Sequence, residues 1–199
     1  MNNSTTRYTK TAVILHWLIA LGILFMLAFG WFMTGLPREG AKSSSYDLFN
    51  LGIYTWQLAE EVSPRTFYFN LHKSIGVTLL ALIAFRVYWR LSHQPPALLS
   101  SLKAWERKLA DAAHKLLYVL MVAMPVSGLL MALYSKFGVK WFGLAFLPGL
   151  DNKTVREVFL AVHEWVGLAL ALLILLHIAG ALKHKFINKD ETMKRMSLH

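Results

Sequence analysis

Histidines inside long apolar stretches are the residues of this sequence best suited to do chemistry. Six of the eight histidines lie in or at the end of such stretches: His16, His72, His114, His163, His177 and His184. Ionisable side chains are costly inside a membrane and usually face the interior of a helix bundle, so each is a candidate functional residue. His93 and His199 lie outside the apolar stretches, and we assign them no specific role.

Four apolar runs must position these histidines, and they extend over residues 11–34, 67–91, 112–134 and 158–182. Each run is long enough to cross about 30 Å of hydrocarbon as a helix that rises about 1.5 Å per residue. The runs lack the sustained two-residue alternation of a membrane β-barrel. We therefore predict an all-α integral membrane four-helix bundle that forms a single domain over residues 1–199.

The composition agrees with a membrane protein, since 56 % of the 199 residues are hydrophobic and only 16 % are charged. Lys and Arg exceed Asp and Glu by ten. In a soluble protein this excess would suggest a nucleic-acid partner, but here the basic residues flank the apolar runs, where they would face lipid headgroups. We expect membrane lipid and no nucleic acid as partner. The absence of cysteine excludes iron–sulfur clusters and c-type haem attachment.

The distribution of basic residues predicts the orientation. If both termini are cytoplasmic, the inner side carries 13 of the 21 Lys and Arg residues and the outer side carries eight. The positive-inside rule therefore favours an N-in, C-in topology. The outer connection over residues 35–66 is long, and the spacing of its apolar residues suggests a short amphipathic helix on the outer face.

Depth along the runs pairs four of the histidines. His16 and His177 each lie about five residues from the inner end of their runs, and His72 and His163 lie about five residues from the outer end. His163 and His177 are 14 residues apart, which is about 21 Å along a helix and within about 40° of the same azimuth. One face of the last helix can thus present one ligand to each of two stacked haems, with His16 and His72 as the opposite ligands.

Two other interpretations of these histidines remain open. A single buried histidine often makes a hydrogen bond across helices, although four at matched depths favour haem. Iron or zinc without a porphyrin is disfavoured because the one nearby carboxylate, Glu164, is adjacent to His163 and off the ligand face. Two axial histidines would leave no open position on the iron, which is typical of an electron carrier.

Two glycines fit a flat macrocycle at the outer plane. Gly76 follows His72 by four residues and Gly167 follows His163 by four, so each lies one turn beyond its histidine on the same face. The missing side chains would make room for a porphyrin. The alternative is that both glycines serve close helix packing.

At these residues the sequence resembles the bacterial cytochrome b561 family, within the di-haem cytochrome b group that includes subunits of nickel–iron hydrogenases and formate dehydrogenases. The resembling stretches include AVILHWLIALGILFMLAFGWFMTGLP, LHKSIGVTLLALIAFRVYWRLSHQPPAL, AHKLLYVLMVAMPVSGLLM and HEWVGLALALLILLHIAGALKHKFI. The resemblance implies a multi-pass protein of the bacterial inner membrane that binds two haem b groups. It implies the same ligand pairs, His16 with His177 and His72 with His163.

The resemblance also implies a reaction, in which superoxide is oxidised at the periplasmic side and ubiquinone is reduced near the inner haem. The alternative is a membrane-anchor subunit that passes electrons from a separate dehydrogenase or hydrogenase to quinone. Two departures from the family are His184-Lys185, where adjacent histidines are common, and the long first outer loop. The third interpretation of the sequence is a structural or transport bundle that binds no haem.

Five further residues are candidates around the haems. His114 and His184 would lie near the inner haem and could hydrogen-bond a quinone or pass it a proton, although interfacial histidines also bind headgroups and water. Arg7 and Arg86 could pair with haem propionates or extend to lipid phosphate. Lys73, beside His72, could attract superoxide toward the outer haem.

Overall fold

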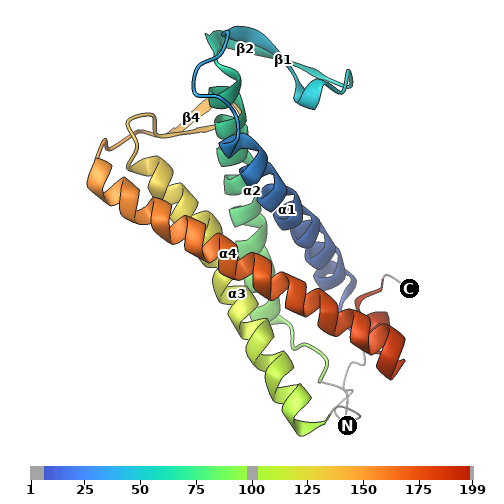
Figure 1. The fold of residues 1–199 in the computed structure, drawn as a ribbon. Helices are drawn as coiled ribbons and strands as arrows, with labels where there is room; N and C mark the ends of the chain where they lie inside the picture. Colours follow the sequence, from blue (N-terminus) through green and yellow to red (C-terminus); the bar gives the residue numbers. More distant parts are fainter. Residues whose placement is uncertain (1–6, 98–102, 198–199) are drawn as a thin grey trace.

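The computed structural model describes residues 7–97 and 103–197, and four long helices dominate these residues. The helices are α1 (Lys10–Thr34), α2 (Pro64–Ser92), α3 (Ala104–Leu133) and α4 (Lys153–Lys183). They run up and down in sequence order, so α1 begins and α4 ends at the same end of the molecule (Figure 1). All four are long and apolar enough to cross a membrane. The predicted bundle of four apolar helices is confirmed.

Side-chain caps fix where three of the helices begin. Thr9, Ser63 and Asn152 each accept a hydrogen bond from a backbone N–H in the first turn of α1, α2 and α4. These residue types satisfy N–H groups that a helix start leaves without a partner. The observed starts at Lys10, Pro64 and Lys153 therefore lie one to five residues before the apolar runs begin.

Helix α3 begins eight residues earlier than the apolar run predicts. The carboxylate of Glu106 accepts the backbone N–H of Lys103 and closes the first turn at 3.1 Å. Trp105 and Leu109 in these first turns are more than half exposed. Because the first turns lie beyond the apolar stretch and carry charged residues, hydropathy alone does not reveal them.

The described core lies mainly between α1 and α2. An inner cluster contains Leu15, Ile19, Leu79 and Ile83, and an outer cluster is centred on Phe29. In contrast, Leu168, Leu172 and Leu175 of α4 are about 60 % exposed. The most apolar windows of the four helices are only 11–22 % buried within the chain. Such surfaces need a lipid environment, since water would make this much apolar exposure unfavourable.

The outer connection is a β-hairpin, so the predicted amphipathic helix within residues 35–66 is wrong. Strand β1 (Ser43–Asp47) pairs antiparallel with β2 (Thr55–Val62), and a single 3₁₀ turn, η1 (Leu48–Asn50), follows β1. In the first half of β2, Trp56 and Leu58 alternate with more exposed polar residues and pack against the outer cluster, so this face of the strand lies against the bundle. Tyr46 stacks on Phe67 of α2 with ring centroids 4.4 Å apart, which fixes the hairpin on the outer end of the bundle (Figure 1).

A second hairpin, not predicted from the sequence, connects α3 to α4. It consists of β3 (Val139–Trp141) and β4 (Leu144–Leu147). Ser74 of α2 accepts a hydrogen bond from the backbone N–H of Phe142, and Thr78 accepts one from the indole of Trp141. These bonds dock the hairpin on α2 within two turns of His72.

Candidate functional site

His72 of α2 and His163 of α4 face each other in the outer half of the bundle. Their ring centroids are 6.4 Å apart and the ring planes make an angle of 83°. Nδ1 of His163 lies 3.0 Å from the carbonyl oxygen of Met124 and 3.1 Å from the hydroxyl of Ser127. The carbonyl can only accept, so Nδ1 carries the proton and Nε2 is left to act as a ligand.

The opposite ring, His72, is held differently. Its Nδ1 is buried and makes no hydrogen bond with any described residue. The ring is packed against Phe29, with centroids 5.8 Å apart. A buried polar atom without a partner is destabilising, and proteins retain such atoms mainly where function requires them.

The inner pair consists of His16 on α1 and His177 on α4. Their ring centroids are also 6.4 Å apart, with an angle of 66° between the planes. His114 of α3 is a third ring in this cluster, with its centroid 5.4 Å from that of His177. The guanidinium of Arg86 lies 3.3 Å from Nδ1 of His16 and contacts the ring of Tyr118.

The separations of both pairs fit an iron atom between two imidazoles. With a metal–nitrogen bond of about 2.0 Å and a nitrogen about 1.2 Å from the ring centre, two opposite imidazoles have centroids about 6.4 Å apart. The pairs His72–His163 and His16–His177 match this value at 6.4 Å. The 5.4 Å between His114 and His177 is about 1 Å too short. The described residues also hold no group of three or more His, Cys, Asp or Glu side chains arranged for a bare metal ion.

Glycines other than the two predicted ones approach the outer rings. A Cβ on Gly128 would lie 2.8 Å from Cε1 of His163, and one on Gly30 would lie 3.6 Å from Cε1 of His72. The predicted glycines, Gly76 and Gly167, are closest to methionine side chains on neighbouring helices. Their role beside a porphyrin stays a prediction.

Ser127 and Gly128 were missed by the sequence analysis although both contact a predicted ligand. They follow Pro125 in the apolar part of α3. Two adjacent small residues at membrane depth are the signal that could have indicated a close approach by another helix. Which side chain they meet depends on how α3 packs against α4, and the sequence does not specify this.

Replacing Gly128 with alanine should displace the His163 ring, because the added methyl group would lie 2.8 Å from Cε1. We expect reduced haem occupancy and an altered absorption spectrum for the outer site. Helix propensity favours the substitution, so a loss would come from the contact and not from the helix. Gly180→Ala is the matched control, since nothing lies within 4 Å of its Cβ position. Equal haem content in both variants would contradict the expectation.

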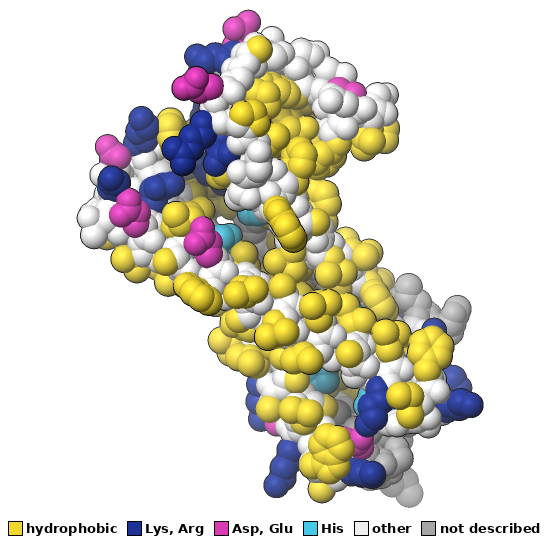
Figure 2. Space-filling model, viewed as in Figure 1, with side chains coloured by type: hydrophobic (Ala, Val, Ile, Leu, Met, Phe, Trp, Pro, Cys, Tyr) yellow, Lys and Arg dark blue, Asp and Glu magenta, His cyan; other side chains and the backbone are white. Residues whose placement is uncertain are grey.

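The remaining candidates lie at the two ends of the bundle. Lys73 donates a hydrogen bond to the carbonyl oxygen of Gly138 at 3.1 Å. The positive charges of Arg156 and Lys140 lie close enough to interact with the ammonium group of Lys73. Figure 2 shows Lys and Arg side chains gathered at this outer end, beside a hollow in which histidine is visible.

At the inner end, Arg7 precedes α1 and is exposed. His184 follows α4 and pairs with Asp190. His93 stacks on Trp89 outside both histidine pairs. His199 lies outside the described residues.

Four membrane-spanning helices with facing histidines at two depths are typical of membrane cytochromes of the b type. The family model described as prokaryotic cytochrome b561 matches residues 7–197, so the chain belongs to this family. Membership implies haem b and quinone-linked electron transfer in a prokaryotic membrane.

Individual relatives match over nearly their whole length. The chain is 33 % identical over 196 residues to "Cytochrome b561 homolog 2" of Escherichia coli, covering 98 % of this chain and 93 % of the relative. It is 26 % identical to "Cytochrome b561 homolog 1" of the same species, with 96 % of each chain covered. It is 29 % identical to "Probable superoxide oxidase CybB" of Yersinia pestis, covering 96 % of this chain and 95 % of the relative.

Proposed function

We propose that this protein binds two b haems and transfers electrons through them across the membrane. His72 and His163 would hold the outer haem, and His16 and His177 the inner one. The observation that carries the proposal is the 6.4 Å separation of both pairs, with one member of each on α4. A b haem held by each of these histidine pairs would supply one-electron chemistry, taking up and releasing single electrons.

Neighbouring residues of the chain would orient these ligands. Met124 and Ser127 fix the tautomer of His163. Arg86 cannot accept a hydrogen bond, so its guanidinium must leave Nδ1 of His16 when that nitrogen carries a proton. It would then be free to pair with a carboxylate such as a haem propionate. The guanidinium of Arg7, which precedes α1 at the inner end, could also donate to such a carboxylate.

The reaction we propose is oxidation of superoxide at the outer side and reduction of ubiquinone at the inner side. Two superoxide anions give up two electrons and become dioxygen, and ubiquinone takes these electrons with two protons and becomes ubiquinol. The similarity to a relative named as a superoxide oxidase supports the donor. The N-in, C-in orientation is supported by the excess of basic residues at the end where α1 begins and α4 ends.

At the outer side, the chain would attract the anion by charge. Lys73, Lys140 and Arg156 form a positive group next to His72. A positive group at the mouth of a site raises the encounter rate of a small anion. Lys73 is attached to the β3–β4 hairpin by its bond to Gly138, so its charge is held near the histidine pair.

Lys73→Gln should lower the rate of superoxide oxidation by about three- to tenfold at low ionic strength, and the difference should shrink as salt is added. Lys73→Arg keeps the charge and should retain most of the rate. Lys153→Gln is the control, because that outer-side lysine is 85 % exposed and pairs with Glu157. A salt-independent loss, or equal rates for the Gln variants, would contradict steering by Lys73.

At the inner side, His114 and His184 would serve the quinone. The ring of His114 lies against that of His177, and His184 follows His177 by two helical turns. Imidazole can hydrogen-bond a quinone carbonyl and exchange a proton near neutral pH.

The proposed reaction is tested with purified protein in detergent, a superoxide source and a soluble ubiquinone analogue. We expect quinol to form at one molecule per two superoxide anions consumed, without a second polypeptide. If dithionite-reduced protein reduces quinone but superoxide does not reduce the protein, superoxide is the wrong donor. Co-purification with a large catalytic subunit that restores turnover would favour the membrane-anchor function.

A further inference from the structure

The segment that follows α4 folds back beneath the inner end of the bundle. It begins with the π-helical turn His184–Asn188, reverses at Lys189 in the left-handed conformation, and continues into the short helix Met193–Met196. The indole of Trp17 on α1 donates a hydrogen bond to the carbonyl oxygen of Met196 at 3.0 Å. Arg195 donates to the carbonyl oxygen of Ala97. Residues 184–197, which we call the C-terminal segment, are therefore attached to the bundle.

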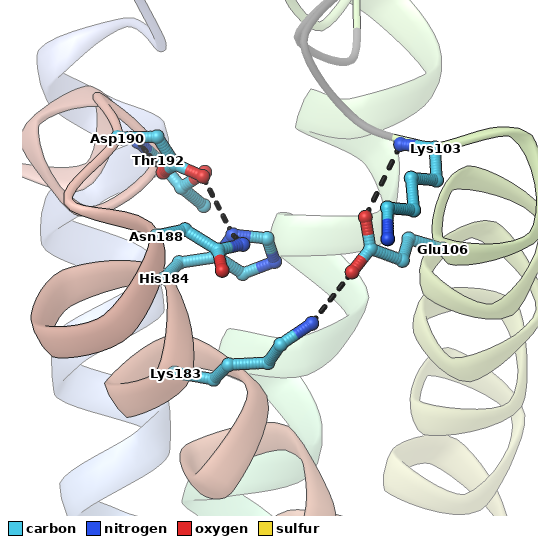
Figure 3. Close-up of polar contacts among 7 residues, drawn as sticks. All are labelled: Lys103, Glu106, Lys183, His184, Asn188, Asp190 and Thr192. Carbon is cyan, nitrogen blue, oxygen red and sulfur yellow. Dashed lines mark hydrogen bonds and ion pairs between the residues drawn. The ribbon is translucent and has the colours of Figure 1, made fainter.

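This fold-back brings an acid against a histidine. Oδ2 of Asp190 lies 2.7 Å from Nδ1 of His184, and the two side chains are only 14 % and 17 % exposed (Figure 3). The backbone N–H of Asp190 also donates to the carbonyl oxygen of His184. Oδ1 of Asp190 accepts the backbone N–H of Thr192 at 2.9 Å. The carboxylate is thus held on one side by the backbone and on the other by the imidazole.

Asp190 is ionised at neutral pH in this arrangement. Burial raises the pKa of its carboxyl, but hydrogen bonds from Thr192 and His184 outweigh burial and hold the pKa below its ordinary value. A carboxylate can only accept, so Nδ1 of His184 carries the proton in this contact. The other nitrogen, Nε2, makes no hydrogen bond with any described residue.

The charges around His184 leave Asp190 as its one direct ionic partner among the described residues. Lys183 and Glu106 form their own ion pair between α4 and the start of α3, and the carboxylate of Glu106 also accepts the N–H of Lys103. In Figure 3 the His184 ring lies between the C-terminal segment and this ion pair. Asn188 contacts Nδ1 as a neutral group.

We propose that Asp190 is the positioning residue of a proton donor, holding His184 so that Nε2 faces a quinone headgroup at the inner end of the bundle. This inference rests on the proposed reduction of quinone. A carboxylate on one nitrogen of an imidazole fixes the tautomer and the ring orientation, as in other acid–base pairs. The C-terminal segment is what brings the carboxylate into place.

Reduction of one quinone to quinol takes two electrons, supplied by two superoxide anions, and two protons. One proton leaves Nε2 of the His184 imidazolium as an O–H bond forms at a quinone carbonyl oxygen. The imidazole remains neutral with its other proton on Nδ1 against Asp190. The second proton reaches the other quinone oxygen from the aqueous side, and Nε2 takes a new proton from the same source.

The experiment compares Asp190→Asn with a change at its neighbour, Glu191→Gln. Glu191 pairs with exposed Lys194 and makes no contact with His184 among the described residues. Protein with both haems bound is reduced with dithionite and mixed with a soluble ubiquinone analogue, and reoxidation is followed spectroscopically. We expect about a tenfold slower reoxidation in Asp190→Asn, little change in Glu191→Gln and partial recovery in Asp190→Glu. Combining Asp190→Asn with His184→Gln should add nothing to the loss from His184→Gln alone.

A second readout does not depend on turnover. In protein labelled with ¹⁵N-histidine, the His184 signal, assigned by its loss in His184→Gln, should show a proton on Nδ1 in the unsubstituted protein and a changed tautomer ratio in Asp190→Asn. If the protein reduces quinone and Asp190→Asn equals Glu191→Gln in both readouts, the positioning role is overturned. If quinone never reoxidises the reduced protein but the His184 tautomer responds to Asp190, the proposed function fails and the pair remains structural.

Discussion

His163→Ala should lower the haem content from two to one per chain and remove the spectrum of the outer site. The variant deletes the ring that faces His72 at 6.4 Å and is held by Met124 and Ser127. The inner pair shares no ring with this site, so it should still bind one haem. Superoxide-driven quinone reduction should fall to background, because the electron path then lacks its outer half.

The control for His163→Ala is His93→Ala. His93 stacks on Trp89 at the inner end of α2 and faces neither pair. It should keep two haems and full activity. If His163→Ala retained both haems, the proposed outer pair would be wrong. If it failed to assemble, Gly128→Ala would test the same site with a smaller change.

His16→Ala should also leave one haem per chain, but it should be the outer one. Superoxide should still reduce this haem, whereas quinone should no longer reoxidise it at the normal rate. The reason is geometric, since His16 is the ring that lies 6.4 Å from His177, the separation expected for two ligands of one iron.

His114→Ala is the matched comparison for His16→Ala, because both rings contact His177. The 5.4 Å between His114 and His177 is too short for an iron between them, so this variant should keep both haems. Its quinone reduction should nevertheless be slower if His114 serves the quinone. Loss of the inner haem in His114→Ala with retention in His16→Ala would reverse the inner assignment.

The helices could be predicted from sequence because lipid imposes a simple requirement on them. A span must satisfy its backbone hydrogen bonds internally and must present about 20 apolar residues, and both properties are visible in hydropathy. The equal depths of His16 and His177, and of His72 and His163, then follow from the constant rise of a helix. The side-by-side placement of these rings in the structure agrees with that reasoning.

The outer hairpin could not be predicted in the same way. Apolar residues such as Leu48, Leu51 and Tyr54 are spaced as on a helix, whereas the alternation that marks a strand is confined to residues 55–58. Tyr46 and Trp56 both contact Phe67 of α2, and this packing favours strands over a helix in this segment. Tertiary packing of this kind commonly overrides a short local pattern.

The contacts around the ligands were also beyond sequence reasoning. Ser127, Gly128 and Asp190 reach a histidine only because α3 packs along α4 and the chain reverses after His184. The azimuth at which two helices meet depends on many side chains at once, so spacing within one helix does not fix it. Spacing could indicate Gly76 and Gly167 as candidates, but the neighbouring helix determines what each glycine meets.

The number of haems per chain is the most direct test of whether both histidine pairs bind haem. The purified protein is analysed by a pyridine haemochrome assay against quantitative amino-acid analysis, with a reduced-minus-oxidised spectrum to identify the haem type. We expect two b haems per chain, one for each histidine pair. A value of one would contradict the two-site arrangement, and a value of zero would contradict haem binding altogether.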